Sequence, residues 1–207
     1  MLNSLPLKQL SASLEGTLLY DELHKTIYST DASVYKFRPI AVALPKTVGD
    51  ITKLIHFANA NKISLTPRTA GTSLAGQTVG SGIIVDVSKY FTKIVSFDAN
   101  KKTVTVQPGV IRDELNLFLK PHGLFFGPNT STSNRCMIGG MVGNNSSGTT
   151  SIRYGVTRDK IVEIKALLSD GSSVVFKELS SAEFIEKTKG DSLESKIYKT
   201  IYEELSN

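Results

Sequence analysis

PRTAGTSLAGQ, residues 67–77, is a loop of small and polar residues between two short apolar runs, 63–65 and 82–87. Glycine lets the backbone take positive φ and lets a ligand come close. Backbone N–H groups in such a turn can converge on an anion, hydroxyls add donors, and Arg68 adds a permanent charge. The loop is therefore predicted to hold a phosphate-like group, the alternative being a glycine-rich surface turn between two strands.

A second stretch, GPNTSTSNRCMIGGMVGNNSSG at residues 127–148, is also small, polar and free of acidic residues. Together the two stretches offer more donors than one phosphate can use, which indicates a long anionic ligand held between them. No Gly-Lys-Ser/Thr tripeptide of a Walker loop occurs, and no G-x-G-x-x-G opens a helix. The two common nucleotide-binding motifs are thus excluded.

Five short segments, which follow one another in the family's order, resemble the sequences of a flavoprotein family. Residues 67–76, 106–110, 122–126, 138–141 and 154–159 are similar to the FAD-binding domain of the vanillyl-alcohol oxidase/p-cresol methylhydroxylase (PCMH) type. Within that family the resemblance is strongest to FAD-linked 2-hydroxyacid dehydrogenases of the D-lactate dehydrogenase and glycolate oxidase kind. The segments 31–35 and 144–146 resemble members that carry an iron–sulfur segment after the flavin part. The resemblance covers about residues 28–207.

The resemblance implies an α+β, PCMH-type FAD-binding fold of two subdomains with mixed sheets and with FAD between them. We expect residues 1–207 to be one FAD-binding domain, with a first subdomain at 1–90 that carries the loop 67–77. The second subdomain, 91–207, is expected to supply the segments that contact the flavin and the adenine. The alternation of strands and helices without a strict βαβ repeat also favours an α+β fold with a mixed or antiparallel sheet.

The same resemblance implies the cofactor contacts. The loop 67–77 is expected to hold the pyrophosphate, the second stretch to run along the flavin side, and backbone groups near residue 161 to contact the adenine edge. The expected cofactor-binding residues are Pro67, Arg68, Thr69, Ala70, Gly71, Thr72, Ser73, Gly76, Gln77, Pro128, Ser131, Thr132, Ile138, Gly139, Gly140, Gly143, Asn145, Ser146, Gly148, Arg153, Tyr154, Gly155 and Ile161.

The sequence departs from the family pattern at four places. Thr69 and Ala70 stand where glycines are usual; because Ala70 is small and Thr69 can donate a hydrogen bond, binding is expected to be preserved. Thr72 stands where a histidine carries covalent FAD in some relatives, so the FAD is expected to be non-covalent. The pair 129–130, Asn-Thr, replaces the usual Asp-Pro. Cys136 falls near the flavin in this alignment, and its ordinary interpretation is a small buried side chain.

Composition limits the other function classes. The net charge is +5 and the basic residues are scattered, which indicates no nucleic-acid surface. The one cysteine excludes an internal disulfide and an iron–sulfur cluster within this chain. No apolar run is long enough for a signal peptide or a transmembrane segment, so we expect a cytoplasmic protein, peripheral to a membrane at most through a partner. No metal site is expected.

Periodicity predicts the elements. A helix is expected over 4–28, a buried strand at 40–44, and a helix capped by Thr47 with Asp50 three residues later. Further predictions are hairpins over 93–107 and 161–176, a helix from residue 111, and two helices at 180–188 and 192–205. Leu193, Ile197, Thr200 and Ile201 are the expected packing face of the last helix.

The function implied is an FAD-dependent oxidoreductase that oxidises a 2-hydroxy acid, with an electron acceptor and with a substrate domain that this chain lacks. An iron–sulfur segment or subunit is a candidate partner. None of the three histidines falls on the family's catalytic motifs, so no catalytic residue is assigned. The alternatives are an alcohol or sugar oxidase on the same domain, a non-catalytic flavin-binding subunit, and a structural domain with empty glycine loops.

Overall fold

The structure, a computed structural model, describes residues 4–206. The chain forms two compact units, Met1–Lys160 and Ile161–Asn207, which are taken separately below as the first and second unit. Within the described residues, no helix has both the length and the apolar character needed to cross a membrane.

The first unit is built on a mixed four-stranded sheet with strand order β1-β2-β4-β3. Strand β2 pairs antiparallel with β1 and parallel with β4, and β4 pairs parallel with β3. Strands β2 and β4 are buried along their whole length, as expected for the two central strands of a covered sheet. The strands are β1 (Thr17–Leu19), β2 (Ala41–Leu44), β3 (Leu65–Arg68) and β4 (Ile83–Asp86).

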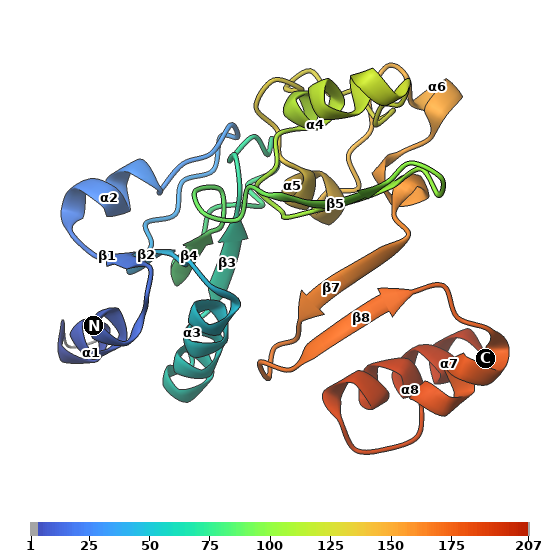
Figure 1. Ribbon diagram of the computed structural model, residues 1–207. Helices are drawn as coiled ribbons and strands as arrows, with labels where there is room; N and C mark the ends of the chain where they lie inside the picture. The colour runs from blue at the N-terminus through green and yellow to red at the C-terminus, as the bar shows by residue number, and fades with distance from the viewer. Residues whose placement is uncertain (1–3, 207) are drawn as a thin grey trace. The chain divides into compact units, whose positions relative to one another are not determined.

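Helices cover both faces of this sheet. On one face, α1 (Ser4–Ser13) and α3 (Val48–Asn61) contribute Leu10 and Leu54 to a core shared with alternate residues of β2 and β4. On the other face, Val42 and Ile84 pack with Tyr28, which follows α2 (Glu22–Ile27). Figure 1 shows β3 running from α3 toward the loops and short helices that carry the site.

The helix predicted after Thr47 is present, and Thr47 caps it by accepting from the N–H of Asp50. Asp50 is fully buried and its carboxylate accepts from the N–H groups of Glu15, Gly16 and Lys46, each at 2.9 Å. Burial opposes the charge of Asp50, but these backbone hydrogen bonds outweigh it and the pKa of the carboxyl is lowered. Asp50 therefore joins the chain before β1 to the start of α3.

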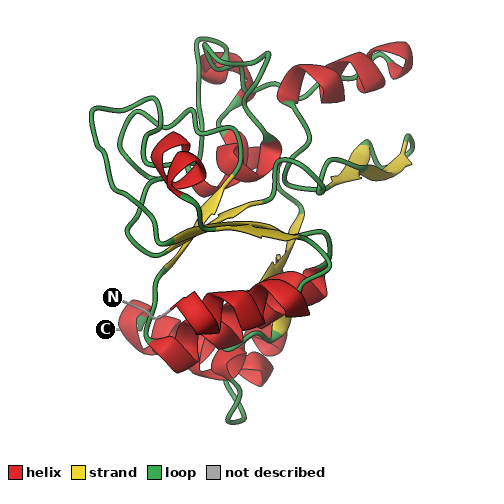
Figure 2. Ribbon diagram, turned by 90° about the vertical axis from the view of Figure 1, so that its left-hand side faces the viewer, coloured by secondary structure: helices red, strands yellow, loops and turns green. Residues whose placement is uncertain are grey.

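The rest of the first unit surrounds a second core of Leu115, Leu119, Ile138 and Met141 with neighbouring apolar residues. A hairpin and short helices enclose it, and much of this part of the chain is loop (Figure 2). The elements are β5 (Ile94–Asp98), β6 (Thr103–Val106), α4 (Arg112–Leu119), η1 (Lys120–His122), α5 (Ile138–Gly143), α6 (Ser151–Tyr154) and η2 (Thr157–Lys160).

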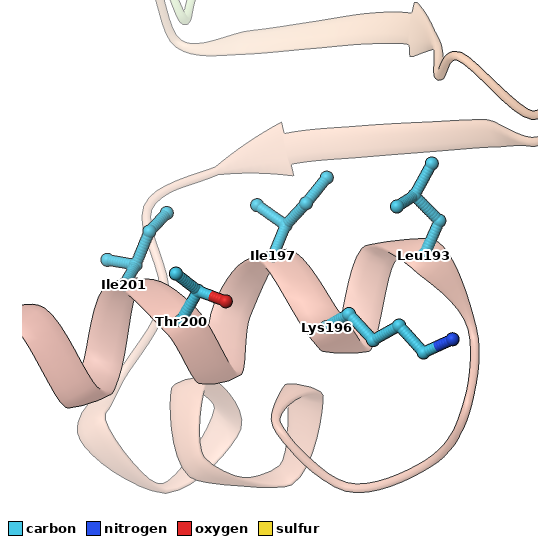
Figure 3. A pocket seen from close by; sticks show the side chains of 5 residues that line it. All are labelled: Leu193, Lys196, Ile197, Thr200 and Ile201. Atoms are coloured by element: carbon cyan, nitrogen blue, oxygen red, sulfur yellow. The ribbon is translucent and has the colours of Figure 1, made fainter.

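The second unit is a hairpin, β7 (Glu163–Leu167) and β8 (Ser173–Lys177), with α7 (Ser181–Lys187) and α8 (Leu193–Leu205). The predicted packing face of α8 is half-buried at Leu193 and Ile197 and exposed at Thr200 and Ile201. Tyr198 is the buried aromatic of α8, with its ring 5.3 Å from Phe184. The predicted residues Leu193, Ile197, Thr200 and Ile201 instead line an open, mostly apolar groove with Lys196, and Figure 3 shows them along one side of the helix.

Two other predictions, the helix over 4–28 and the subdomain boundary near residue 90, can be compared with the structure. The single helix predicted over 4–28 is wrong in its middle, because Thr17–Leu19 pairs with β2 and the chain bends at Gly16, where a Cβ would meet the backbone of Leu44. The compact units divide after Lys160, whereas the subdomain boundary near residue 90 stays a prediction. In favour of this boundary, the apolar residues that pack on the two faces of the sheet lie within 7–90, and those of the second core lie within 94–142.

Candidate cofactor site

The loop 69–77 leaves β3 at Arg68 and returns toward β4. Gly71 and Gly76 hold φ angles of 66° and 70°, a left-handed conformation that glycine adopts without strain. A Cβ at Gly71 would lie 2.6 Å from Nη2 of Arg68, and one at Gly76 would lie 2.7 Å from the ring of Tyr35. The predicted glycines are thus required by both backbone conformation and close packing.

The second half of the loop is held by its own serine. The hydroxyl of Ser73 accepts from the N–H groups of Ala75 at 3.1 Å and Gln77 at 3.2 Å. It donates to Oε1 of Gln77 at 2.9 Å. Ser73 therefore shapes the loop, and a ligand would have to replace Gln77 as the acceptor of its proton.

The first half of the loop has its backbone donors free. Within residues 4–206, the N–H groups of residues 69–74 donate no hydrogen bond to the protein. These residues are half-buried apart from Leu74, which is exposed. Since backbone N–H groups need partners, a run of free donors that no acidic residue interrupts fits a phosphate group or solvent.

Arg68 faces the protein. Its Nη1 donates to the carbonyl oxygens of Thr30 at 2.8 Å and Thr78 at 3.4 Å, and its guanidinium lies 5.1 Å above the ring of Tyr28. The hydroxyl of Tyr28 donates in turn to Asp86 at 2.7 Å. Burial and the nearby Asp86 carboxylate raise the pKa of Tyr28, which keeps its hydroxyl protonated.

The second glycine stretch meets the first at α5. A Cβ at Gly140 would lie 2.6 Å from Oγ1 of Thr69, so the loop and this short helix are in contact through these two residues. The start of α5 is fixed from the other side, because Ile138 and Gly139 donate their N–H groups to the carbonyls of Val110 and Pro108 at 2.9 and 2.8 Å. The structure therefore brings together residues 69 and 140, which the sequence predicted for one ligand.

The stretch 127–132 is tied to the chain that follows α5. Thr150 donates to the carbonyl of Gly127 at 2.9 Å, and Gly148 packs against the backbone of Asn129. Of the predicted contact residues here, Pro128 is fully buried, as is most of Ile138, so both face the interior, whereas Ser131 is exposed.

Asn145 and Ser146 are anchored to the start of η2. Oδ1 of Asn145 accepts from the N–H of Arg158 at 3.0 Å, and the carbonyl of Ser146 accepts from both N–H and Oγ1 of Thr157. Asn145 holds a positive φ of 47°, which asparagine tolerates better than most residues. These contacts explain the two residues as parts of a rigid turn, beside any role toward a ligand.

The remaining predicted residues lie at the end of the first unit. The Tyr154 ring lies 5.0 Å from that of Phe125, edge to face, and the Arg153 guanidinium lies 5.4 Å from the same Tyr154 ring. Gly155 holds a φ of 74°. Ile161 begins the second unit, so its place relative to the loop is outside what the structure describes.

Cys136 is buried, as expected, with its Sγ 3.2 Å from Oγ1 of Thr130 and 3.6 Å from Sδ of Met141. His24 pairs with Asp21 at 2.7 Å, and the His122 ring lies 4.5 Å from that of Phe97, tilted by 44°. Among the described residues, no group of three His, Cys, Asp or Glu could hold a metal ion.

Sequence reasoning missed the support beneath the loop, formed by Tyr28, Asp31 and Asp86. Asp31 accepts from the Ser33 N–H and from Oγ1 of Thr78. One signal was available: Asp86 interrupts an apolar run in a buried strand, and a buried carboxylate needs a hydrogen-bond donor. Nothing in the sequence indicated that Tyr28 supplies it.

The comparisons with known proteins show the family of the chain. Residues 39–177 match a family model described as an FAD binding domain. D-2-hydroxyglutarate dehydrogenase of Haemophilus influenzae is 39% identical over 195 residues, which cover 90% of this chain and 19% of that protein. Glycolate oxidase subunit GlcD of Bacillus subtilis is 32% identical, over 72% of this chain and 32% of that protein. The chain thus spans a minor part of the length of both relatives.

A solved structure of alkyldihydroxyacetonephosphate synthase superposes with a TM-score of 0.74 at 18% identity, over 94% of this chain and 37% of that one. This likeness shows the fold. With the family match over most of the chain, it confirms the α+β fold with a mixed sheet and the FAD cofactor expected from the sequence. The chain belongs to the FAD-binding domain family of the vanillyl-alcohol oxidase/p-cresol methylhydroxylase type.

Proposed function

We propose that this chain is the FAD-holding part of an oxidoreductase that oxidises a 2-hydroxy acid. One observation carries the placement of the cofactor: free N–H groups at residues 69–74 lie beside the contact between Thr69 and Gly140. The loop can thus donate to a pyrophosphate while α5 approaches it without a side chain in the way.

In this proposal the backbone of 69–73 and the hydroxyl of Thr72 hold the pyrophosphate. The second glycine stretch, with Ser131, Thr132 and Gly143, lines the flavin side, and Arg153 and Tyr154 close the site. Pro128 and Ile138 support these contacts from the interior. Because Thr72 offers no imidazole for a flavin link, the FAD is held without a covalent bond.

Bound FAD would supply the acceptor for a hydride equivalent from the α-carbon of the substrate. This chain's own residues would hold and orient the cofactor. The base that takes the hydroxyl proton, the groups that bind the substrate carboxylate, and the electron acceptor would come from a substrate domain or a partner, of which an iron–sulfur subunit is one candidate. We also propose a cytoplasmic location, with any membrane contact made through that partner.

The similarity to D-2-hydroxyglutarate dehydrogenase and to a glycolate oxidase subunit supports a 2-hydroxy acid as the substrate. A second candidate function is that of an alcohol or sugar oxidase, because the fold is shared with other flavoenzymes. A third is that of a non-catalytic flavin-binding subunit.

The test is an assay of the FAD-loaded protein, with any subunit that co-purifies, using an artificial dye as electron acceptor. The substrates are D-2-hydroxyglutarate, D-lactate and glycolate, with a primary alcohol and a sugar as comparisons. Dye reduction with a 2-hydroxy acid supports the proposal. Reduction with only the alcohol or the sugar supports the second function. The chain alone is proposed to lack the groups that bind the substrate, so absence of reduction supports the third function only when the FAD-loaded chain is assayed together with a subunit that co-purifies.

A further inference from the structure

Arg68 is the one charged side chain in the loop that sequence reasoning assigned to the phosphate. The structure gives its guanidinium other partners, namely the carbonyls of Thr30 and Thr78 and the ring of Tyr28. One carbonyl belongs to the segment before β2 and the other to the residue that follows the loop. Arg68 therefore joins the segment before β2 to the end of the loop.

The support continues below Arg68 into the sheet. Tyr28, under the guanidinium, donates to Asp86, and Asp86 is 5% exposed at the end of β4, directly opposite Arg68 in the β3–β4 register. Asp86 also accepts from the Ser88 N–H at 2.8 Å. The contacts from Arg68 to Tyr28 and from Tyr28 to Asp86 thus connect the loop to a buried strand. They restrict the motion of the residues at the base of the loop.

The loop is fitted around this support. Gly71 packs on Nη2 of Arg68, and its carbonyl accepts from the N–H of Ala32 at 3.2 Å. Asp31, which precedes Ala32, accepts from Oγ1 of Thr78, the residue that follows the loop. The free N–H groups of residues 69–74 are thus presented by a backbone whose shape depends on Arg68.

We infer that Arg68 is a positioning residue: with Tyr28 and Asp86 it holds the loop 69–77 in the conformation that binds the FAD pyrophosphate, instead of donating to the phosphate itself. This inference rests on the proposed function and changes the role first expected for Arg68. A preorganised loop loses less freedom on binding, so loosening the support should weaken binding even though no phosphate contact is removed.

Lysine substitution distinguishes two roles of Arg68, a contact to the phosphate and support of the loop. A phosphate contact needs a positive charge, which lysine supplies as a point charge. The support needs a planar, forked group that stacks on Tyr28 while reaching two carbonyls, and lysine does not reproduce that geometry. Tyr28→Phe gives a second distinction, because it removes the hydrogen bond to Asp86 and leaves Arg68 in place.

The experiment measures the dissociation constant of FAD by quenching of flavin fluorescence, using the whole 207-residue chain with its fold checked by circular dichroism. The variants are Arg68→Lys, Arg68→Met and Tyr28→Phe. Arg38→Met is the matched control, because Arg38 is an exposed arginine paired with Glu22 outside the loop. Limited proteolysis of the FAD-free protein reports on the loop without any ligand.

We expect Arg68→Lys and Arg68→Met to weaken FAD binding alike, by about tenfold, and Tyr28→Phe to weaken it by a few-fold. The double variant Tyr28→Phe, Arg68→Met should lose less than the product of the single losses, because both changes release one support. Cleavage within 69–77 should become faster in all three single variants, and Arg38→Met should behave as the parent chain.

The inference is overturned if Arg68→Lys keeps the parent affinity while Arg68→Met loses it, or if Tyr28→Phe leaves both affinity and cleavage unchanged. Where the Arg68 variants do not fold, Tyr28→Phe alone decides by the same two readouts. A parent chain that binds no FAD at all would instead overturn the proposed function, and the inference with it.

Discussion

Gly140→Ala tests the contact that places the two glycine stretches on one ligand. A Cβ at residue 140 would lie 2.6 Å from Oγ1 of Thr69, whereas ordinary contacts begin at 3.4 Å. Thr69 must therefore rotate or the loop must retreat by about 0.8 Å. In the FAD-free chain the Thr69 side chain can rotate while Arg68 keeps the rest of the loop in place, because the N–H groups of 69–74 have no partner to lose among the described residues.

The bound state lacks that freedom, since the pyrophosphate would fix the loop against α5. A side chain forced off its rotamer costs roughly 0.5–1.5 kcal/mol, which corresponds to about a two- to thirteenfold weaker FAD affinity. The melting temperature of the FAD-free chain should change little. The assay is a fluorescence titration with FAD, with thermal unfolding measured by circular dichroism on the same samples.

Thr69→Ala should rescue Gly140→Ala, because the Cβ of Thr69 is 4.0 Å from the new methyl group, an ordinary contact. Gly49→Ala is the control: it adds a methyl group to a helical glycine of α3 that has room for it. The reasoning is refuted if Gly140→Ala binds FAD like the parent chain, or if its loss persists in full when Thr69→Ala is added.

Three further predictions follow from other parts of the structure. Gly71→Asp should abolish FAD retention, because it forces positive φ on a side chain and sets a carboxylate beside the pyrophosphate; a folded variant with a full complement of FAD would contradict the placement of the loop. Asp50→Asn should lower the free energy of unfolding at pH 7 by about 1–3 kcal/mol in urea titrations, since a buried acceptor of three backbone donors is weakened; an unchanged midpoint would contradict this role. The pKa of Asp50 is lowered in the folded chain, so its contribution is complete above the ordinary value of about 4 and is lost as the pH falls through the lowered one; stability should therefore depend less on pH below about 4 in Asp50→Asn than in the parent, and equal acid sensitivity would count against it.

The helices and strands whose formation depends on a local sequence pattern were predictable from the sequence. The buried strand before Pro45, the helix capped by Thr47 and the two hairpins are all confirmed. Each depends on a short periodic run and a turn or cap residue next to it. The strand at Thr17–Leu19 was missed, because its conformation comes from pairing with β2 and not from its own sequence.

The segments that form the candidate site were predictable from the sequence, but many of the side-chain contacts within it were not. Glycines mark where the backbone must turn or come close: Gly71 holds a positive φ and packs closely, and Gly140 allows a close approach to Thr69. Which side chains face inward depends on distant partners. Arg68 turns to Thr30 and Tyr28, and Pro128 is buried, through contacts that no local pattern contains.

The most direct test of the central claim is the visible absorption spectrum of the chain after incubation with FAD and desalting, recorded before and after acid precipitation. The account predicts flavin bands on the desalted protein that move to the supernatant on precipitation, which means FAD bound without a covalent link. Bands that stay in the pellet would contradict the non-covalent attachment argued from Thr72. A folded protein that stays colourless would contradict the claim that these loops hold FAD.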